Sequence, residues 1–252
     1  MLTLPWPDPQ VDFSPAPEAD VSLGVFETLL VVDGRPLEAG RHLERLRGSL
    51  AVLYAAELAA DLERRVADAA TGQRLARLRI DVDPQAPTPA QIAVRPFDPE
   101  LVLAPDDVAV VTVRVSAGAG PHKLIDRGWL ARIEAAAGAG ARPLLVTRSG
   151  ALLETTRANV FLLRRGELAT PPLDGSILPG VMREVVLERA RDLGIAAREV
   201  PLTLKDLRAA DMLLLSGSLR LLERARLRGD RRSDQAAARL AGALDVRGGG
   251  GT

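Results

Sequence analysis

The stretch "RPLLVTRSGALLETTRANVFLLRRGELATPP" (142–172) holds three apolar runs separated by two short turns. The turns are Ser149-Gly150 and Arg165-Gly166, and glycine readily adopts the backbone angles that reverse a chain. Short apolar runs bounded by turn residues are typical of buried strands. The stretch therefore predicts a meander that belongs to a sheet in the second half of the chain.

Helices and further strands flank this meander. Residues 124–140 predict a helix that ends at glycines, and residues 178–195 predict a helix entered through Pro179-Gly180 and ended by Gly194. The segment "ADMLLLSGSLRLLERARL" (210–227) predicts a strand, a turn of small residues and another strand. Strands with intervening helices predict a second domain of the α/β class.

The first half of the chain gives different signals. Residues 24–37 predict two strands around Asp33-Gly34, a strong hairpin signal. Apolar residues at 43, 46, 50 and 53 have helical spacing and predict a helix over 39–54, and residues 57–70 predict another. Further strands are predicted at 74–84, 91–97 and 107–115. We therefore expect an α+β domain with mostly antiparallel strands.

A break in composition separates the two halves. The segment "SAGAGPHK" (116–123) consists largely of small residues, which predicts an interdomain connection. Gly118 and Gly120 form a GxG pair, but the later glycine of a dinucleotide-binding fingerprint is missing. The interpretation is a linker, with an α+β domain over 1–115 and an α/β domain over 116–252.

Composition excludes several classes of function. The 252 residues are 47% hydrophobic with zero formal net charge, so a globular protein is expected, without overall electrostatic attraction to nucleic acid. The absence of cysteine excludes disulfides and thiolate catalysis, and two distant histidines make a metal site improbable. We see neither a signal-peptide pattern nor an apolar run long enough to span a bilayer, so a cytoplasmic protein is expected.

Lysine is rare in this chain. Of 33 basic side chains two are lysines, Lys123 and Lys205. Arginine can replace lysine as a surface charge, but its guanidinium stays protonated and cannot form a Schiff base. A retained lysine is thus a candidate amine nucleophile. A solvated surface lysine is the plainer interpretation, and we favour it for Lys205 in the predicted surface helix "LTLKDLRAADM" (202–212).

Two turns have the character of anion sites. The helix that follows Pro179-Gly180 leaves the N–H groups of Val181 and Met182 without intrahelical partners. The Gly217-Ser218 turn offers close backbone approach and a hydroxyl. Because every helix begins in this way, each turn taken alone is more simply read as plain structure.

Five motifs in order give a more specific signal: "HLERL" (42–46), "HKLIDR" (122–127), "LLETTRANVF" (152–161), "TPPLDGSILPGVMRE" (170–184) and "ADMLLLSGSLR" (210–220). Together they resemble the class IV aminotransferases, the pyridoxal-phosphate enzymes of fold type IV, over about residues 24–222. The resemblance implies a small N-terminal α+β domain, a larger C-terminal α/β pseudo-barrel domain, and pyridoxal 5'-phosphate as the cofactor.

The resemblance also assigns roles. Lys123 would form the Schiff base with the cofactor and shuttle a proton, and Glu154 would pair with the pyridine nitrogen. A protonated ring is the better electron sink, which gives this pairing a physical reason. Asn159 would orient its neighbours. The cofactor phosphate would be bound by Arg45, the backbone of Val181 and Met182, and the Gly217-Ser218 turn.

For the reaction, "GPHKLIDRGWL" (120–130) and "LLETTRANVFLL" (152–163) look most like aminodeoxychorismate lyases. Such enzymes remove pyruvate from 4-amino-4-deoxychorismate and leave 4-aminobenzoate, a folate precursor. The alternative is a transaminase for D-amino or branched-chain amino acids. A catalytically silent cofactor-binding module is a third hypothesis, and the retention of Lys123, Glu154 and Arg45 argues against it.

The substrate pocket is the least specified part of this interpretation. Thr28 on the first strand is a candidate substrate residue. Arg77 and Arg79 could bind a substrate carboxylate, although alternation along a strand could equally direct them to solvent. The resemblance further implies a homodimer in which the partner helps to close the pocket.

Overall fold

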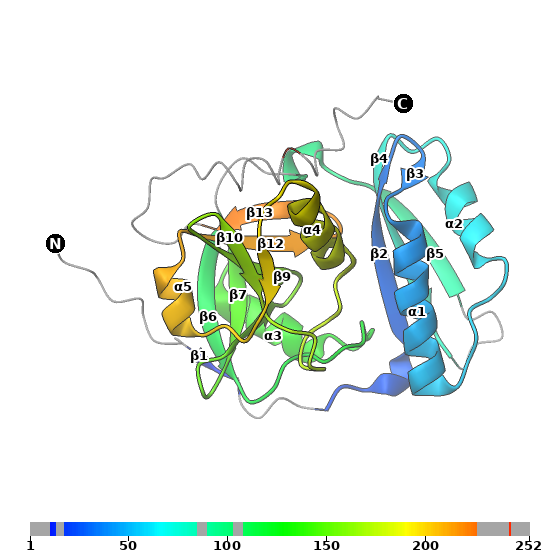
Figure 1. The fold of residues 1–252 in the computed structure, drawn as a ribbon. Helices are drawn as coiled ribbons and strands as arrows, with labels where there is room; N and C mark the ends of the chain where they lie inside the picture. The colour runs from blue at the N-terminus through cyan, green and yellow to red at the C-terminus, as the bar shows by residue number, and fades with distance from the viewer. Residues whose placement is uncertain (1–10, 14–17, 85–89, 103–107, 226–241, 243–252) are drawn as a thin grey trace.

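The chain begins in one sheet, builds a second and then returns to the first. The computed structural model describes residues 11–13, 18–84, 90–102, 108–225 and 242. Strand β1 (Val11–Asp12) pairs in parallel with β6 (Ala109–Val115), although the residues between them form a separate sheet. The result is a mixed α/β fold of two neighbouring bodies, as the sequence predicts (Figure 1).

The first body is built on an antiparallel sheet in the order β3-β2-β4-β5. Its strands are β2 (Val25–Val32), β3 (Arg35–Pro36), β4 (Leu75–Val82) and β5 (Ala90–Pro96). Asp33 and Gly34 connect β2 and β3 with positive φ angles of 46° and 77°, which is the backbone of a tight hairpin turn. The predicted hairpin and the mostly antiparallel pairing are thereby confirmed.

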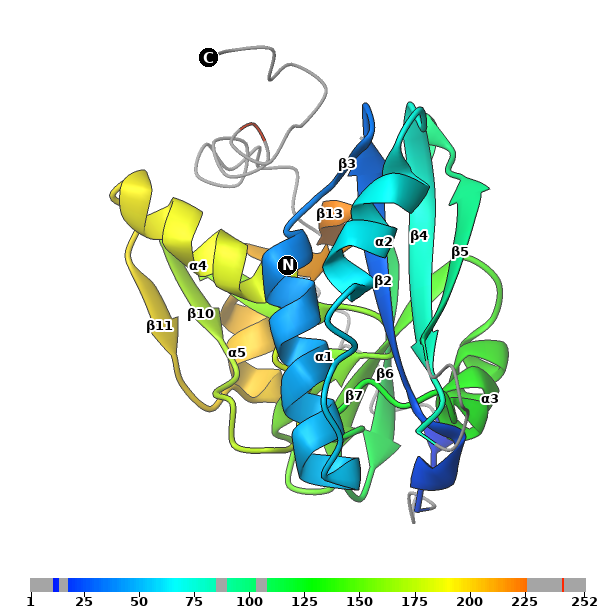
Figure 2. The ribbon, with the colours of Figure 1, turned by 90° about the vertical axis from the view of Figure 1, so that its right-hand side faces the viewer.

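Helices α1 (Ala39–Tyr54) and α2 (Leu62–Ala70) cover one face of this sheet (Figure 2). Alternate residues of β4, such as Leu78 and Ile80, are fully buried against apolar residues of α1, including Leu46. The predicted helix over 57–70 starts too early, because α2 begins at Leu62; the preceding Asp61 makes no side-chain capping hydrogen bond. The opposite face of the sheet turns toward the second body, where Leu30 packs.

The second body contains two sheets that close on each other. One has the order β1-β6-β7-β8 and the other β11-β10-β9-β12-β13. A bridge between Val108 and Ala225 joins β13 to the start of β6, and apolar side chains such as Leu144 and Leu215 fill the space between the sheets. The remaining strands are β7 (Ala141–Thr147), β8 (Leu152–Thr155), β9 (Asn159–Arg164), β10 (Glu167–Thr170), β11 (Ala197–Glu199), β12 (Met212–Gly217) and β13 (Leu221–Ala225).

The predicted meander differs from the structure in one respect. Its second apolar run is not one strand but two, β8 and β9, which lie in different sheets. The run breaks at residues 156–158, where the Ala158 carbonyl accepts a hydrogen bond from the Thr155 amide at 2.9 Å. Glu154 therefore lies near the end of one strand and Asn159 at the start of the next.

Within the described residues, three helices complete the second body: α3 (Gly128–Ala137), α4 (Val181–Asp192) and α5 (Leu204–Ala209). Helix α3 begins four residues later than predicted, because residues 123–125 are hydrogen-bonded to residues 24–26 instead. Lys205 lies on α5, as predicted. No helix in the described part of the chain is both long and apolar enough to cross a membrane.

The predicted domain limits do not coincide with the sheets. A boundary after residue 115 leaves β6 in the first domain, whereas β6 hydrogen-bonds to β7 along its whole length. On this pairing the first sheet ends at β5 and β6 belongs with the second body. The division into two independent domains stays a prediction.

Candidate active site

Lys123 is held against the first sheet by its backbone. The Phe26 amide donates to the Lys123 carbonyl at 2.9 Å, and the Ile125 amide donates to the Gly24 carbonyl at 2.9 Å. The end of the predicted linker thus runs beside β2 and connects the two bodies. The Lys123 ammonium lies 4.9 Å from the centroid of the Phe26 ring.

The environment of Lys123 favours a neutral amine. The side chain keeps partial access to solvent, yet it lies among protein atoms, and this burial lowers its pKa to about 8. Arg45 and Arg127 lower the pKa in the same direction, and Glu27 and Glu154 oppose them. Near neutral pH an appreciable fraction of this amine is unprotonated, as a nucleophile requires.

Glu154 is a buried acid without an ion-pair partner among the described residues. Its Oε1 accepts from the Leu178 amide at 3.1 Å, and its Oε2 accepts from the Asn159 side-chain amide at 3.2 Å. Burial raises the pKa of Glu154 to about 8, although the Leu178 N–H and the charge of Lys123 oppose the shift. A carboxyl group poised in this way would become a carboxylate when a cation approaches it.

Asn159 fixes the turn that leads into α4. Its side-chain amide also donates to the Leu178 carbonyl at 2.9 Å. A Cβ on Gly180 would lie 1.8 Å from Asn159 Oδ1, so glycine is needed for this close approach. Asn159 therefore connects Glu154 to the beginning of α4, and an orienting role remains our prediction.

The start of α4 faces the first body. The Arg45 Nη1 of helix α1 donates to the Pro179 carbonyl at 2.8 Å, one residue before the N-cap Gly180. No side chain in the described part of the chain caps this helix, so the amides of Val181 and Met182 remain available as donors. A guanidinium and a helix N-terminus thus meet at one place, which favours an anion.

A buried carboxylate that sequence reasoning missed holds Arg45. Glu27 accepts from Arg45 Nε at 2.7 Å and from Arg45 Nη2 at 2.8 Å, and Nδ1 of His42 lies 2.8 Å from its Oε2. Burial raises the pKa of Glu27, but Arg45 and His42 outweigh it, so the pKa falls to about 2. The bidentate pair and the bond to the Pro179 carbonyl use three of the five guanidinium N–H groups of Arg45 and leave two.

His42 extends this network to the second body. Burial lowers the pKa of His42, against the opposing influence of Glu27, so the ring is neutral. With Glu27 ionised, the ring proton lies on Nδ1, and Nε2 is an acceptor for the Ser218 hydroxyl at 3.4 Å. Ser218 follows Gly217 in the turn between β12 and β13. The signal for this network was an acidic residue within the apolar strand "GVFETLLVV" (24–32).

The predicted substrate residues lie on the sheet face that points toward the second body. Thr28 and Leu30 of β2 pair with Arg79 and Arg77 of β4, and paired residues of an antiparallel sheet share a face. The Arg79 guanidinium lies 3.9 Å from the Phe26 centroid, so this face is the one beside Lys123. Neither arginine is directed to the helical side of the sheet.

Arg127 was not predicted as a site residue. Its guanidinium lies 5.8 Å from the same Phe26 centroid, and its Nη2 donates to the Thr156 carbonyl at 2.5 Å. Its position four residues after Lys123 was visible in "HKLIDR" (122–127), but the sequence does not reveal which ring it would face.

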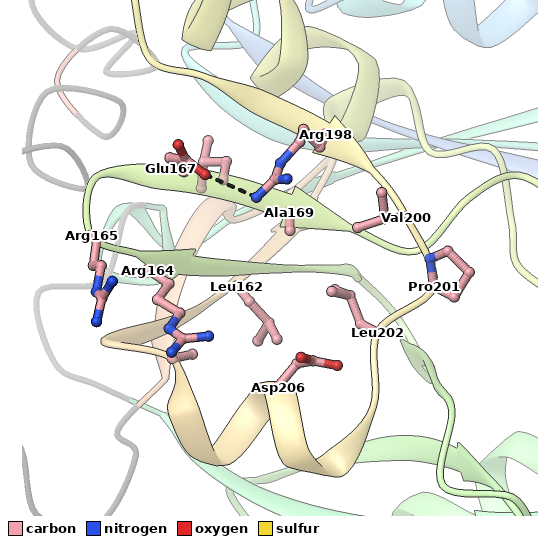
Figure 3. A pocket seen from close by; sticks show the side chains of 12 residues that line it. Leu162, Arg164, Arg165, Glu167, Ala169, Arg198, Val200, Pro201, Leu202 and Asp206 are labelled. Carbon is pink, nitrogen blue, oxygen red and sulfur yellow. Dashed lines mark hydrogen bonds and ion pairs between the residues drawn. The ribbon is translucent and has the colours of Figure 1, made fainter.

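Lys205 lies away from these residues, exposed on α5. A hollow of about 430 Å³ lies between α5 and the sheet that contains β9 and β10 (Figure 3). Arg198 and Glu167 form an ion pair at 2.9 Å in its wall, and none of the candidate site residues lines it. This hollow is therefore separate from the candidate active site.

Comparison with known proteins gives a consistent picture. The sequence model described as "Amino-transferase class IV" matches residues 24–226. The aminodeoxychorismate lyase of Bacillus subtilis is 26% identical over 220 residues, which is 78% of this chain and 74% of that protein. A putative branched-chain-amino-acid aminotransferase of Methanocaldococcus jannaschii is 40% identical over 89 residues, or 35% of this chain. The chain spans only 31% of the length of that relative.

Solved structures show the same architecture. A hypothetical aminotransferase from Mycobacterium tuberculosis in its PLP-bound form is 27% identical, with a TM-score of 0.77 over 93% of this chain and 95% of that chain. The same protein has been solved with alpha-ketoglutarate and PMP, with a TM-score of 0.78.

Proposed function

This chain belongs to the class IV aminotransferases, and we propose that it is a pyridoxal-phosphate enzyme that converts 4-amino-4-deoxychorismate into 4-aminobenzoate and pyruvate. The three parts of the proposal are the cofactor, the residues that handle it and the choice of substrate. Each is supported by the geometry of the candidate site.

The residues of the site fit the cofactor. Arg45 and the amides of Val181 and Met182 supply donors for a phosphate. Ser218 would add its hydroxyl by turning its single proton from His42 Nε2 to the phosphate. Glu154 is a buried acid that lacks a cationic contact within the described residues, which suits a protonated pyridine nitrogen. Lys123 supplies an amine of lowered pKa within electrostatic reach of that acid.

When bound, pyridoxal phosphate would supply an electron sink for the negative charge that develops at the amine-bearing carbon of the substrate. Lys123 Nζ would accept the proton from that carbon and return a proton to the departing enolpyruvyl group. The carbon–oxygen bond to this group breaks as the ring becomes aromatic, and the enol becomes pyruvate. Substrate atoms and electrons balance, so no second substrate is needed.

Glu154 and Asn159 would work as a pair in this scheme. Glu154 would keep a proton on the ring nitrogen, and Asn159 would hold the carboxylate in place through its side-chain amide. Because Asn159 also bonds the Leu178 carbonyl, it would couple the acid to the phosphate end of the site at the start of α4.

One observation carries the choice of the lyase: the side of Lys123 that faces β2 and β4 is lined by guanidinium groups. Arg79 and Arg127 both lie over the Phe26 ring beside the lysine. A branched-chain amino acid would need an apolar pocket for its side chain, whereas aminodeoxychorismate carries carboxylates that pair with arginine. The long match to the Bacillus subtilis lyase supports the same choice.

A transaminase is the second candidate. The 40% identity to the Methanocaldococcus jannaschii protein supports it, although the match covers about a third of either chain. A transaminase needs a keto acid to complete each cycle, and a lyase does not. We also propose, from the family alone, that the protein is cytoplasmic and forms a homodimer. Sedimentation analysis would test the dimer.

The deciding experiment is to incubate the cofactor-loaded protein with aminodeoxychorismate and no keto acid. We expect equal amounts of 4-aminobenzoate and pyruvate over many turnovers. Lys123→Arg should fold, retain the charge and lose all turnover, and borohydride reduction should attach the cofactor to Lys123 in the wild type. Rapid bleaching by D-alanine or leucine that 2-oxoglutarate reverses would instead identify a transaminase.

A further inference from the structure

We infer that Arg77 and Arg127 are the residues that bind the substrate's carboxylates, and that they select a substrate with two such groups. This inference rests on the proposed function, because it concerns the same site. It assigns the pocket that the sequence left open and separates the roles of three neighbouring arginines.

Arg127 lies near Lys123 at the ring of Phe26. The two side chains share the Phe26 ring, at 5.8 Å and 4.9 Å from its centroid. Burial lowers the pKa of Arg127, Glu134 opposes this, and the charges of Arg157 and Arg79 lower it further. The side chain of Arg127 is 27% exposed, and its contact with Glu134 is at the 4.0 Å limit of an ion pair. A guanidinium in this position gains more from a new anion than an exposed one does.

Glu134 forms its close ion pair with another arginine, Arg157. It forms a bidentate pair with Arg157, at 2.8 Å and 2.5 Å. The Arg127 Nη2 group donates to the Thr156 carbonyl, which is neutral and does not compensate the charge. The positive charge of Arg127 is therefore left without a close carboxylate of its own within the described residues.

Arg77, two residues before Arg79 on β4, also has no close carboxylate partner within the described residues. Among the residues that the structure describes, it makes neither a hydrogen bond nor an ion pair. Burial lowers the pKa of Arg77, and the charges of Arg79 and Arg157 lower it further, while the charge of Asp81 opposes them. Asp81 is already bound by Arg79, so this cluster of like charges favours an added anion.

Arg79, by contrast, already has a partner. Its Nε lies 2.8 Å and 2.9 Å from the two oxygens of Asp81, and its Nη2 lies 2.6 Å from one of them. The charge of Arg79 acts on both Arg77 and Arg127. Arg77 lies two residues from Arg79 on β4, about 7 Å away. Arg77 and Arg127 would thus engage separate groups of one ligand.

The charges support a ligand with two negative groups. Asp81 compensates Arg79 and Glu134 compensates Arg157, which leaves Arg77 and Arg127 as two uncompensated cations. In the cofactor-loaded protein the protonated ring nitrogen would offset the charge of Glu154, so Glu154 adds no net negative charge for the substrate. A monocarboxylate would leave one of the two guanidinium groups unpaired.

The test uses chorismate as the probe, because it carries two carboxylates and lacks the reacting amine. Binding to the cofactor-loaded protein is measured by calorimetry for the wild type, Arg77→Gln, Arg127→Gln and the double variant. Arg64→Gln is the matched control, since Arg64 is exposed on α2 and pairs with Asp68. Each site variant should weaken binding about tenfold or more, the double variant should abolish it, and Arg64→Gln should leave it unchanged.

A second ligand, 4-aminobenzoate, has one carboxylate and should lose affinity in only one of the two site variants. Absence of chorismate binding to the wild type, or equal binding by all variants, would overturn the inference. Turnover of aminodeoxychorismate is measured alongside. If the wild type turns over aminodeoxychorismate but chorismate affinity is the same in Arg77→Gln and Arg127→Gln as in the wild type, the inference is refuted and the proposed function stands. If chorismate binding depends on both arginines but the wild type does not turn over aminodeoxychorismate, the proposed function is refuted and the inference stands.

Discussion

The buried Glu27 offers the sharpest test of the site's architecture. Its carboxylate is 1% exposed and pairs with both Arg45 and His42. The pKa of Glu27 falls from 4.5 to about 2, and a shift of this size corresponds to about 3 kcal/mol of stabilisation at neutral pH. Removing one partner of a buried ion pair typically costs ~3–5 kcal/mol, so the two approaches agree. Glu27→Gln should therefore lower the free energy of unfolding by about 3 kcal/mol at pH 7.

The pH dependence has a definite sign. Because the folded pKa lies below the unfolded value, the contribution of Glu27 is complete above pH 4.5 and is lost as the pH falls toward 2. Urea unfolding of the cofactor-free protein should thus show a gap between wild type and variant that narrows below pH 4.5. Glu44→Gln is the control, since Glu44 forms an exposed pair with Arg47 that is worth ~0–1 kcal/mol. A gap below about 1 kcal/mol at pH 7, or one that does not change with pH, would refute the reasoning.

Two further variants test other parts of the site. Glu154→Gln should still bind cofactor but turn over at least ~100-fold more slowly. Since burial raises the pKa of Glu154 to about 8, the cofactor-free variant should also gain stability over wild type as the pH rises from 4.5 to 8. Equal unfolding curves for the two proteins across that pH range would contradict the assignment. Gly180→Ala should cost ~1–3 kcal/mol and weaken cofactor binding in an absorbance titration, because its Cβ would collide with Asn159 Oδ1 while its φ of −71° suits any residue. Gly48→Ala, in open space within α1, should instead stabilise by ~0.5–1 kcal/mol, and similar unfolding curves for both alanine variants would count against the steric argument.

Much of the fold could be predicted from local pattern. The hairpin at Asp33-Gly34, helix α1 and the surface position of Lys205 follow from turn chemistry and helical spacing. The errors concern pairing between distant segments. Nothing in residues 107–115 shows that this strand joins β7 and not the first sheet, because strand partners are chosen by tertiary packing.

The candidate site also contains residues that the sequence predicted and residues that it did not. Lys123, Glu154 and Asn159 lie in motifs whose order and spacing can be read from one chain. Glu27 and Arg127 escaped because their roles depend on a partner far away in sequence: Glu27 on helix α1, and Arg127 on the ring of Phe26. A charged residue within an apolar strand was a signal for Glu27, and no comparable signal existed for Arg127.

The hydrogen bonds that hold Lys123 beside β2 also constrain how the chain acquires its shape. They join residues 24–26 to residues 123–125, so the lysine reaches its place only after about a hundred intervening residues have been synthesised. Strand β1 likewise can pair with β6 only after a similar number of residues has been synthesised. The first sheet, whose β2, β4 and β5 come before residue 100, can form earlier on the ribosome. Contacts of such high sequence separation are slow to form, and the reactive centre is therefore among the last parts of the molecule to be assembled.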